Sequence, residues 1–314
     1  MIQATNVTRK KDGVFRELRQ NGSMYVMALP GVLFFFVFAY LPMIGIVIAF
    51  QDYNPIKGLF GSAFVGLKNF RFFFLSGDWK TVTFNTVFLN ALFISTGMVT
   101  SIAIAIMFTE IGNRRFKKVG QSVMILPHFV SWPIAGMIIY GLLATDNGLI
   151  NGILMSLGCN KLSFYTQASL WPPILVILRL WKGAGWGSII YLAAITGIDQ
   201  EIYESARIDG ASRFQMIFRI TLPMLKPTVF LMLLLAVGGI FSGDFGMIYT
   251  LVGDAARLYP TTDVIDTFVF RMLRVANNPG MAASVGLFQS VLGFLFVVGS
   301  NSLVRKFSPE SAIF

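Results

Sequence analysis

Charge, cysteine and histidine are all scarce in this 314-residue chain, of which only 13% is charged. It holds one cysteine, Cys159, and one histidine, His128. A single cysteine excludes an internal disulfide and a thiolate metal cage, and His128, beside Pro127, is expected to be structural. The dipeptide Gly-Lys is absent, so the chain contains no GxxxxGK[ST] phosphate loop. We therefore predict that the chain is not an enzyme and binds no metal or cofactor of its own.

Apolar residues make up 55% of the sequence, and the mean hydropathy is +0.69. A soluble globule of this composition would expose large apolar patches. Six continuous apolar runs approach the roughly 20 residues that a helix needs to cross a bilayer, and continuous runs favour helices over a barrel. The sequence predicts an all-α integral membrane protein with six transmembrane helices, near residues 24–50, 87–108, 119–143, 170–195, 224–248 and 281–304.

The basic residues are unevenly divided between the two sides of this arrangement. Lys and Arg gather in residues 9–19, 114–118, 207–226 and 305–306, all on one side. Cytoplasmic loops retain such residues, so both termini are expected in the cytoplasm. The first run is too long for a signal peptide, which leaves a cytoplasmic segment 1–23 before a transmembrane domain 24–314. The bias explains the net charge of +10, so anionic lipid is expected as the neighbour and nucleic acid is not.

A polar segment, residues 199–223, separates the fourth and fifth runs. Asp199 is placed to cap a short helix, Glu201 and Glu204 lie near its positive end, and Gly210 can take the left-handed conformation that ends it. Small residues would let this helix approach a partner closely, and Pro223 is expected to start the fifth span. An ordinary capped loop is the alternative. The segment also has a fixed spacing of particular residues, which are Glu204, Ala206, Gly210, Ile220, Leu222 and Pro223.

That spacing resembles the EAA loop of ABC-importer permeases, with Ser205 where the family usually has alanine. In that family the loop seats a short helix in a groove of the ATPase. The resemblance implies that an ATPase contacts the following residues: Glu201, Tyr203, Glu204, Ser205, Ala206, Asp209, Gly210 and Ala211.

Other segments, including residues 41–70, 148–151, 245–253 and 262–271, look like carbohydrate-uptake permeases. Among these they look most like the branch for complex oligosaccharides, which includes alginate- and pectin-derived uronides. The resemblance implies the MetI-like fold of type I importer permeases in a bacterial cytoplasmic membrane. It also implies a second, related permease, two cytoplasmic ATPases that hold ATP and Mg²⁺, and an external sugar-binding protein.

Polar residues inside spans are costly and mark candidate translocation paths. They are Arg179, Trp181, Lys182, Trp186 and Asp244. Charges suit hydroxyl or carboxylate groups, and indole faces suit the CH faces of sugars. The alternative is that Arg179 or Lys182 pairs with Asp244 while the tryptophans anchor at the bilayer boundary. The glycines at 183, 187, 239 and 243 are expected to allow close helix packing.

Other functions remain open at this stage. A permease for a non-sugar solute, such as a peptide or amino acid, would share the EAA-like loop. A secondary transporter would place more charges inside its spans, and a membrane scaffold would bind partners without flux. The long connections 51–84 and 249–280 suit either docking of a binding protein or a scaffold for the helix ends.

Replacing Glu204 by lysine, or Gly210 by a bulky residue, is expected to uncouple ATPase activity from transport. Membrane insertion should be unchanged, because both positions lie outside the apolar runs. Uptake and ATPase activity measured in parallel on the same vesicles check this expectation, and normal uptake in both variants would refute the coupling assignment.

Overall fold

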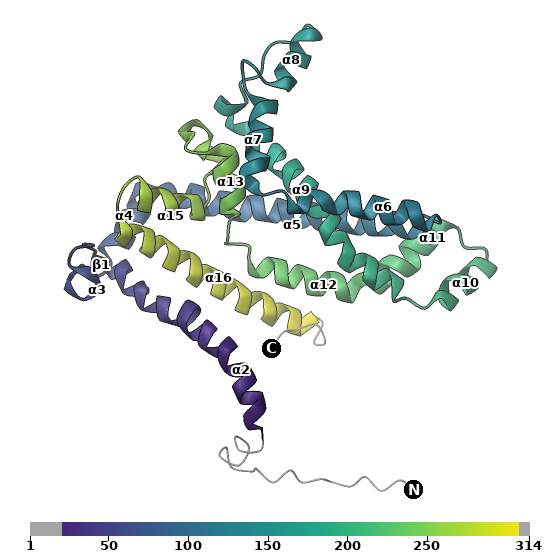
Figure 1. Cartoon of the computed structure of the whole chain (residues 1–314), viewed down its shortest axis with the longest axis horizontal. Helices are drawn as coiled ribbons and strands as arrows, with labels where there is room; N and C mark the ends of the chain where they lie inside the picture. The colour runs from purple at the N-terminus through teal and green to yellow at the C-terminus, as the bar shows by residue number, and fades with distance from the viewer. Residues whose placement is uncertain (1–20, 308–314) are drawn as a thin grey trace.

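The computed structural model describes residues 21–307, and helices make up most of it. Figure 1 shows three long helices, α5, α12 and α16, running roughly along the long axis of the molecule. One end of this axis carries α10 (Gln200–Ile208), and we call it the α10 end. The opposite end carries α4 (Lys68–Ser76) and the short hairpin of β1 (Gln51–Asp52) and β2 (Ala63–Phe64); we call it the α4 end.

The expected six spans are present among the described residues, as five helices and one bent pair. The five helices are Gly22–Phe50, Asp78–Glu110, Ala168–Thr196, Arg213–Gly238 and Pro279–Ser302; the bent pair is Arg114–Phe129 with Trp132–Leu143. The first, fourth and sixth agree with the predicted spans to within a few residues. The second begins at Asp78 rather than at residue 87, because polar residues of its first turns still lie in regular helix.

The elements of the spans are as follows: α2 (Gly22–Phe35), η1 (Phe36–Tyr40) and η2 (Leu41–Phe50); α5 (Asp78–Glu110); α6 (Arg114–Ile125), η3 (Leu126–Phe129) and α7 (Trp132–Leu143); η5 (Ala168–Leu170) and α9 (Trp171–Thr196); α11 (Arg213–Met216), η6 (Ile217–Thr221) and α12 (Leu222–Gly238); α16 (Pro279–Phe307). The remaining elements are α3 (Gly58–Gly61), α8 (Leu149–Ser156), η4 (Phe164–Thr166), α13 (Phe245–Val252), η7 (Ala256–Leu258), α14 (Tyr259–Thr262) and α15 (Ile265–Arg274).

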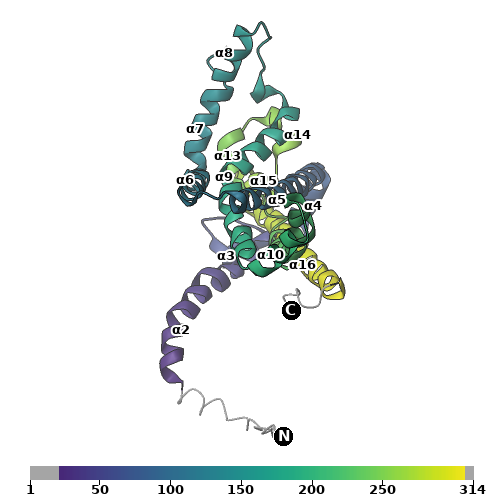
Figure 2. The same cartoon turned by 90° about the vertical axis from the view of Figure 1, so that its right-hand side faces the viewer.

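The third span is not the continuous helix that residues 119–143 predicted. It breaks between η3 and α7 with a bend of 94°, and Val130 and Ser131 are extended there. Pro133 lies in the first turn of α7 and lacks the N–H that a continuing helix would need. Figure 2 shows α7 and α8 rising away from the long helices as a result.

The predicted fifth span, residues 224–248, is wrong at both ends. The helix begins at Arg213 and passes through Pro223 without stopping, because one π-helical turn, η6, precedes the proline. A π turn relieves the crowding that a proline ring causes in the preceding turn. The span ends at Gly238, and residues 239–244 leave the helix before α13 begins.

The main hydrophobic core lies between the middle of α5 and α9 and the short helix α13. Trp171 and Leu175 of α9 are fully buried against Leu89 of α5 and Met247 of α13. The first span contributes little to this core, since no residue of α2 is buried. Its apolar surface is suited to lipid or to another membrane subunit.

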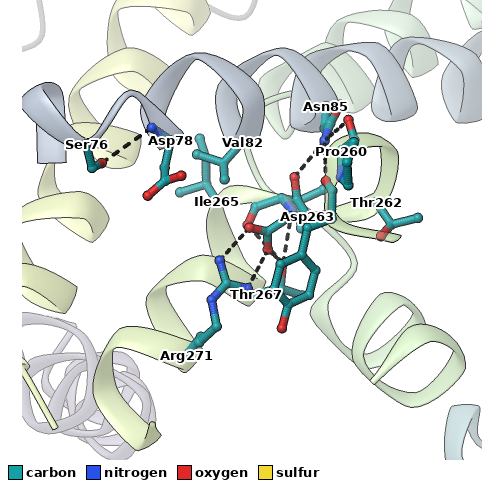
Figure 3. A network of polar contacts seen from close by, with 12 residues as sticks. Ser76, Asp78, Val82, Asn85, Pro260, Thr262, Asp263, Ile265, Thr267 and Arg271 are labelled. Carbon is teal, nitrogen blue, oxygen red and sulfur yellow. Dashed lines mark hydrogen bonds and ion pairs between the residues drawn. The ribbon is translucent and has the colours of Figure 1, made fainter. Parts of the chain in front are cut away.

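The two long connections pack against the spans. The first forms the hairpin and α4, which packs on α16. The second forms α13, which packs on α7 and α15; α14, which packs on α5 and α9; and α15, which packs on α5 and α16. A buried ion pair fixes the second connection (Figure 3): Arg271 donates to Asp263 through both nitrogens of its fork, at 3.0 and 2.6 Å. Asn85 of α5 donates to the carbonyls of Tyr259, Pro260 and Asp263 at 3.1–3.3 Å. This packing supports the scaffold interpretation of the connection.

Arg271 is well matched to this position. Its side chain is 19% exposed and that of Asp263 is 5% exposed, and its guanidinium lies 4.2 Å from the centre of the Tyr259 ring. Burial alone would lower the pKa of Arg271, but the Asp263 carboxylate and Tyr259 raise it overall above its usual value. The arginine therefore stays charged and the pair stays intact.

Replacing Arg271 by lysine is expected to destabilise the protein by about 1–3 kcal/mol, because an ammonium group cannot reproduce the two parallel hydrogen bonds. The exposed Arg274, on the same helix, provides the control: Arg274→Lys should leave the melting temperature of the purified protein unchanged. Equal melting temperatures for the two variants would contradict a stabilising role for the paired hydrogen bonds between Arg271 and Asp263.

Candidate functional site

The polar segment between the fourth and fifth spans folds as a short helix at the α10 end (Figure 1). Asp199 caps α10 by accepting a hydrogen bond from the amide of Glu201 at 3.0 Å, as expected. Gly210 ends the helix with φ of +80°. The amide of Gly210 donates to the carbonyl of Arg207, and the amide of Ala211 donates to that of Ala206. These two bonds make a Schellman cap, which a residue with a side chain would strain.

The segment presents most of its residues outward. Glu201, Glu204, Ser205, Asp209 and Gly210 are exposed, and no residue of α10 is buried. Ala206 and Ala211 are half-buried. The short helix is therefore free to contact a partner along its acidic face.

Tyr203 differs from its neighbours. Its hydroxyl lies 2.9 Å from the hydroxyl of Thr221 in η6, so the ring is turned towards its own chain. Ile208 and Phe214, 87% and 75% exposed, offer the larger apolar surface of this segment. Sequence analysis missed these two residues, and also the capping box in which Ser212 and Gln215 start α11, although the pattern Ser-x-x-Gln signals one.

A second candidate site lies inside the spans. A cavity of about 630 Å³ opens between α5, α9 and α12, and we call it the central cavity. Four of the five predicted path residues lie at or beside it. Arg179, Lys182 and Trp186 line it, and Asp244 pairs with Arg179. Trp181 is half-exposed and is not among the described residues that line the cavity.

Arg179 and Asp244 form an ion pair, which was the alternative considered from the sequence. One carboxylate oxygen of Asp244 accepts from Arg179. The other accepts from the amide of Met247 at 3.0 Å and so caps α13. Asp244 therefore joins the wall of the central cavity to α13.

Lys182 has a different role in the same wall. Its ammonium group donates to the carbonyl of His128 at 2.7 Å and to the carbonyl of Val130. These carbonyls lie at the break in the third span, where no following helical turn can supply an amide. Lys182 thus stabilises the 94° bend while keeping its positive charge beside the cavity.

An aromatic platform completes the wall. The His128 ring stacks on Trp186 with centroids 4.6 Å apart and planes within 6°. Both residues line the central cavity, and Trp186 is 48% exposed. An exposed indole face is the surface that stacks on the CH face of a pyranose ring.

The glycine predictions are correct at two positions. A Cβ on Gly187 would lie 2.6 Å from the hydroxyl of Ser101, and one on Gly243 would lie 2.7 Å from Val264. A Cβ on Gly183 would meet nothing within 4 Å, and one on Gly239 would meet only its own helix at 3.7 Å. The close approach of α9 to α6 occurs instead at Gly185, against the backbone of Met124.

The fold and this cavity define a multi-pass membrane permease. The chain belongs to the family of binding-protein-dependent transport system inner membrane components, whose model matches residues 97–309. These are permease subunits of ABC importers, as the resemblance implied.

Two curated relatives come from Bacillus subtilis. Protein LplB is 35% identical over 293 residues, which cover 93% of this chain and 92% of the relative. The polygalacturonan/rhamnogalacturonan transport system permease protein YteP is 35% identical over 301 residues, which cover 96% and 93%.

Two solved structures are similar over nearly the whole fold. One is a bacterial ABC transporter involved in import of the acidic polysaccharide alginate, with a TM-score of 0.85 and 32% identity over 94% of this chain and 99% of that one. The other is a bacterial alginate ABC transporter in complex with an alginate pentasaccharide-bound periplasmic protein, with a TM-score of 0.86 and 31% identity over 96% and 100%.

Replacing Asp244 by asparagine is expected to lower stability by about 1 kcal/mol, because Arg179 would keep its charge without a partner in a partly exposed site. Adding Arg179→Gln should restore most of this loss, since it removes the unpaired charge. Melting temperatures of the single and double variants in nanodiscs check this. Asp146→Asn, which breaks the exposed pair with Lys161, is the control and should have no effect.

Proposed function

We propose that the chain is the permease subunit of an ATP-driven, binding-protein-dependent importer and forms half of the translocation path for an oligosaccharide. The central cavity is the observation that carries this proposal, because it combines cationic donors with an exposed aromatic face inside the spans. The similarity to YteP and to the alginate importers, at 31–35% identity over most of the chain, supports the same class of cargo.

The charges of the cavity favour an acidic oligosaccharide, such as one derived from alginate or pectin. Two cationic side chains, Arg179 and Lys182, and no aspartate or glutamate are among the described residues that line it. Asp244 offsets the charge of Arg179, whereas the partners of Lys182 are neutral carbonyls. The wall therefore keeps a net positive charge that a uronate carboxylate would complement.

The α10 end would meet the ATPase. Its exposed residues Glu201, Glu204 and Ser205 lie on a capped helix that stands clear of the spans, as a coupling element requires. In this arrangement both termini and the α10 end are cytoplasmic, and the transmembrane domain spans residues 24–314 with the coupling segment at 199–223. The membrane would be the bacterial cytoplasmic membrane.

The partners follow from this assignment. They are a second permease, two cytoplasmic ATPases that bind ATP and Mg²⁺, and an external sugar-binding protein that docks at the α4 end. The alginate structure solved with a periplasmic protein supports the last of these. ATP binding would close the ATPases, move each coupling helix and open the paired permeases outward; hydrolysis would return the cavity inward.

The proposal is tested by the ATPase activity of the reconstituted complex with a panel of neutral and uronic oligosaccharides. Uronic oligosaccharides are expected to stimulate it most. Lys182→Gln removes the charge that no carboxylate offsets but keeps an N–H donor for the carbonyls of His128 and Val130. It should reduce stimulation by a uronic cargo about tenfold more than stimulation by a neutral one, the factor expected for one lost charged hydrogen bond. Lys161→Gln, outside the cavity, should change neither. A flat response to every sugar would reject an oligosaccharide cargo.

A further inference from the structure

Residues 239–244, between α12 and α13, are a non-helical stretch beside the central cavity, and we call them the linker. Gly239 and Ser242 line the cavity, and Asp244 forms the ion pair with Arg179. The linker interrupts an apolar run that the sequence analysis expected to be one continuous helix. Free carbonyls and amides are costly in an apolar environment, so its backbone needs partners from elsewhere.

Side chains from three other helices supply those partners. Asn90 of α5 donates to the carbonyls of Ile240 and Ser242, at 2.9 and 3.0 Å. Gln289 of α16 donates to the carbonyl of Phe241 at 2.8 Å. Asp266 of α15 accepts from the amide of Gly243 at 2.6 Å. Four consecutive residues of the linker are thus held by direct hydrogen bonds from outside it.

Two of the holding residues also hold each other. Gln289 donates to the same carboxylate oxygen of Asp266 at 3.1 Å. Burial raises the pKa of Asp266, and its hydrogen bonds from Gly243 and Gln289 oppose that rise. The backbone of Gly243 lies so near Asp266 that a Cβ on Gly243 would be 2.9 Å from this oxygen. The linker therefore has little freedom to move while α15 and α16 keep their places.

We propose that Asn90, Asp266 and Gln289 act as positioning residues, which hold the linker so that Ser242 and Asp244 face cargo in the central cavity. Of the three, Asp266 and Gln289 are not among the described residues that line the cavity, so they act through the linker and not on cargo. The inference rests on the proposed function only for the identity of the cargo.

The linker can be observed directly with a thiol reporter. Cys159 is the one native cysteine, so Cys159→Ser gives a thiol-free parent, and Ser242→Cys then places a thiol on the linker. The rate of its reaction with a small methanethiosulfonate reagent is measured on this chain, separated from the other subunits after labelling of the assembled complex without cargo. Gln289→Met removes the donors at similar length, and it is expected to raise this rate about tenfold, the factor that one or two lost hydrogen bonds carry.

Two controls separate positioning from general loosening. Gly183→Cys reports from α9, which lines the same cavity and where a Cβ meets nothing within 4 Å, and its rate should not change with Gln289→Met. Ser290→Ala, beside Gln289 on α16, removes a hydroxyl that donates to the carbonyl of Gly286 within its own helix, and it should change neither rate. Asp266→Asn keeps an acceptor for Gly243 and should fall between the parent and Asp266→Ala.

An unchanged rate at Ser242→Cys in both Gln289→Met and Asp266→Ala would overturn the proposal, and so would an equal rise at the two reporters. If Gln289→Met does not assemble, the comparison of Asp266→Asn with Asp266→Ala decides by the same criterion. Protection of Ser242→Cys by oligosaccharide is measured separately in the parent. Its absence would count against the proposed cargo while leaving the rate comparison valid.

Discussion

The structure depends on one constraint: a backbone that leaves its helix inside an apolar layer must find hydrogen-bond partners there. Within residues 21–307, two spans leave their helices. The third does so at Val130 and Ser131, and the fifth does so over residues 239–244. Lys182 supplies donors at the first break, and Asn90 and Gln289 supply them at the second. Polar groups in these spans are therefore placed by the needs of the backbone as well as by those of a cargo.

The same placement gives the central cavity its chemistry. Lys182 donates to the carbonyls of the first break, and Asp244 lies at the end of the second, so each structural contact also sets a charge at or beside the cavity. Asp244 caps α13 and offsets Arg179, whereas Lys182 bonds only neutral carbonyls in the contacts described. A net positive wall follows from these contacts. The proposed preference for acidic cargo thus arises from the side chains that contact the backbone at the two helix breaks.

Several features were predictable because they are local. Six apolar runs predicted six spans, and the cap at Asp199 and the left-handed Gly210 were correct, because capping depends on a few adjacent residues. The bend in the third span and the ends of the fifth were not predictable. Pro223 was expected to start a helix, yet a π turn carries the helix through it. Asn90, Asp266 and Gln289 gave no signal, since each acts on backbone far away in the chain.

The sequence by itself determined the membrane class, the number of spans and the family, because hydropathy, length and motif spacing are properties of consecutive residues. Only the tertiary structure decided which of the polar residues in the spans serve the backbone and which face the cavity. Arg179 and Lys182 are three residues apart on one helix, but one meets a carboxylate and the other meets two carbonyls. That difference arises from the helices packed against them, and no periodicity in the chain encodes it.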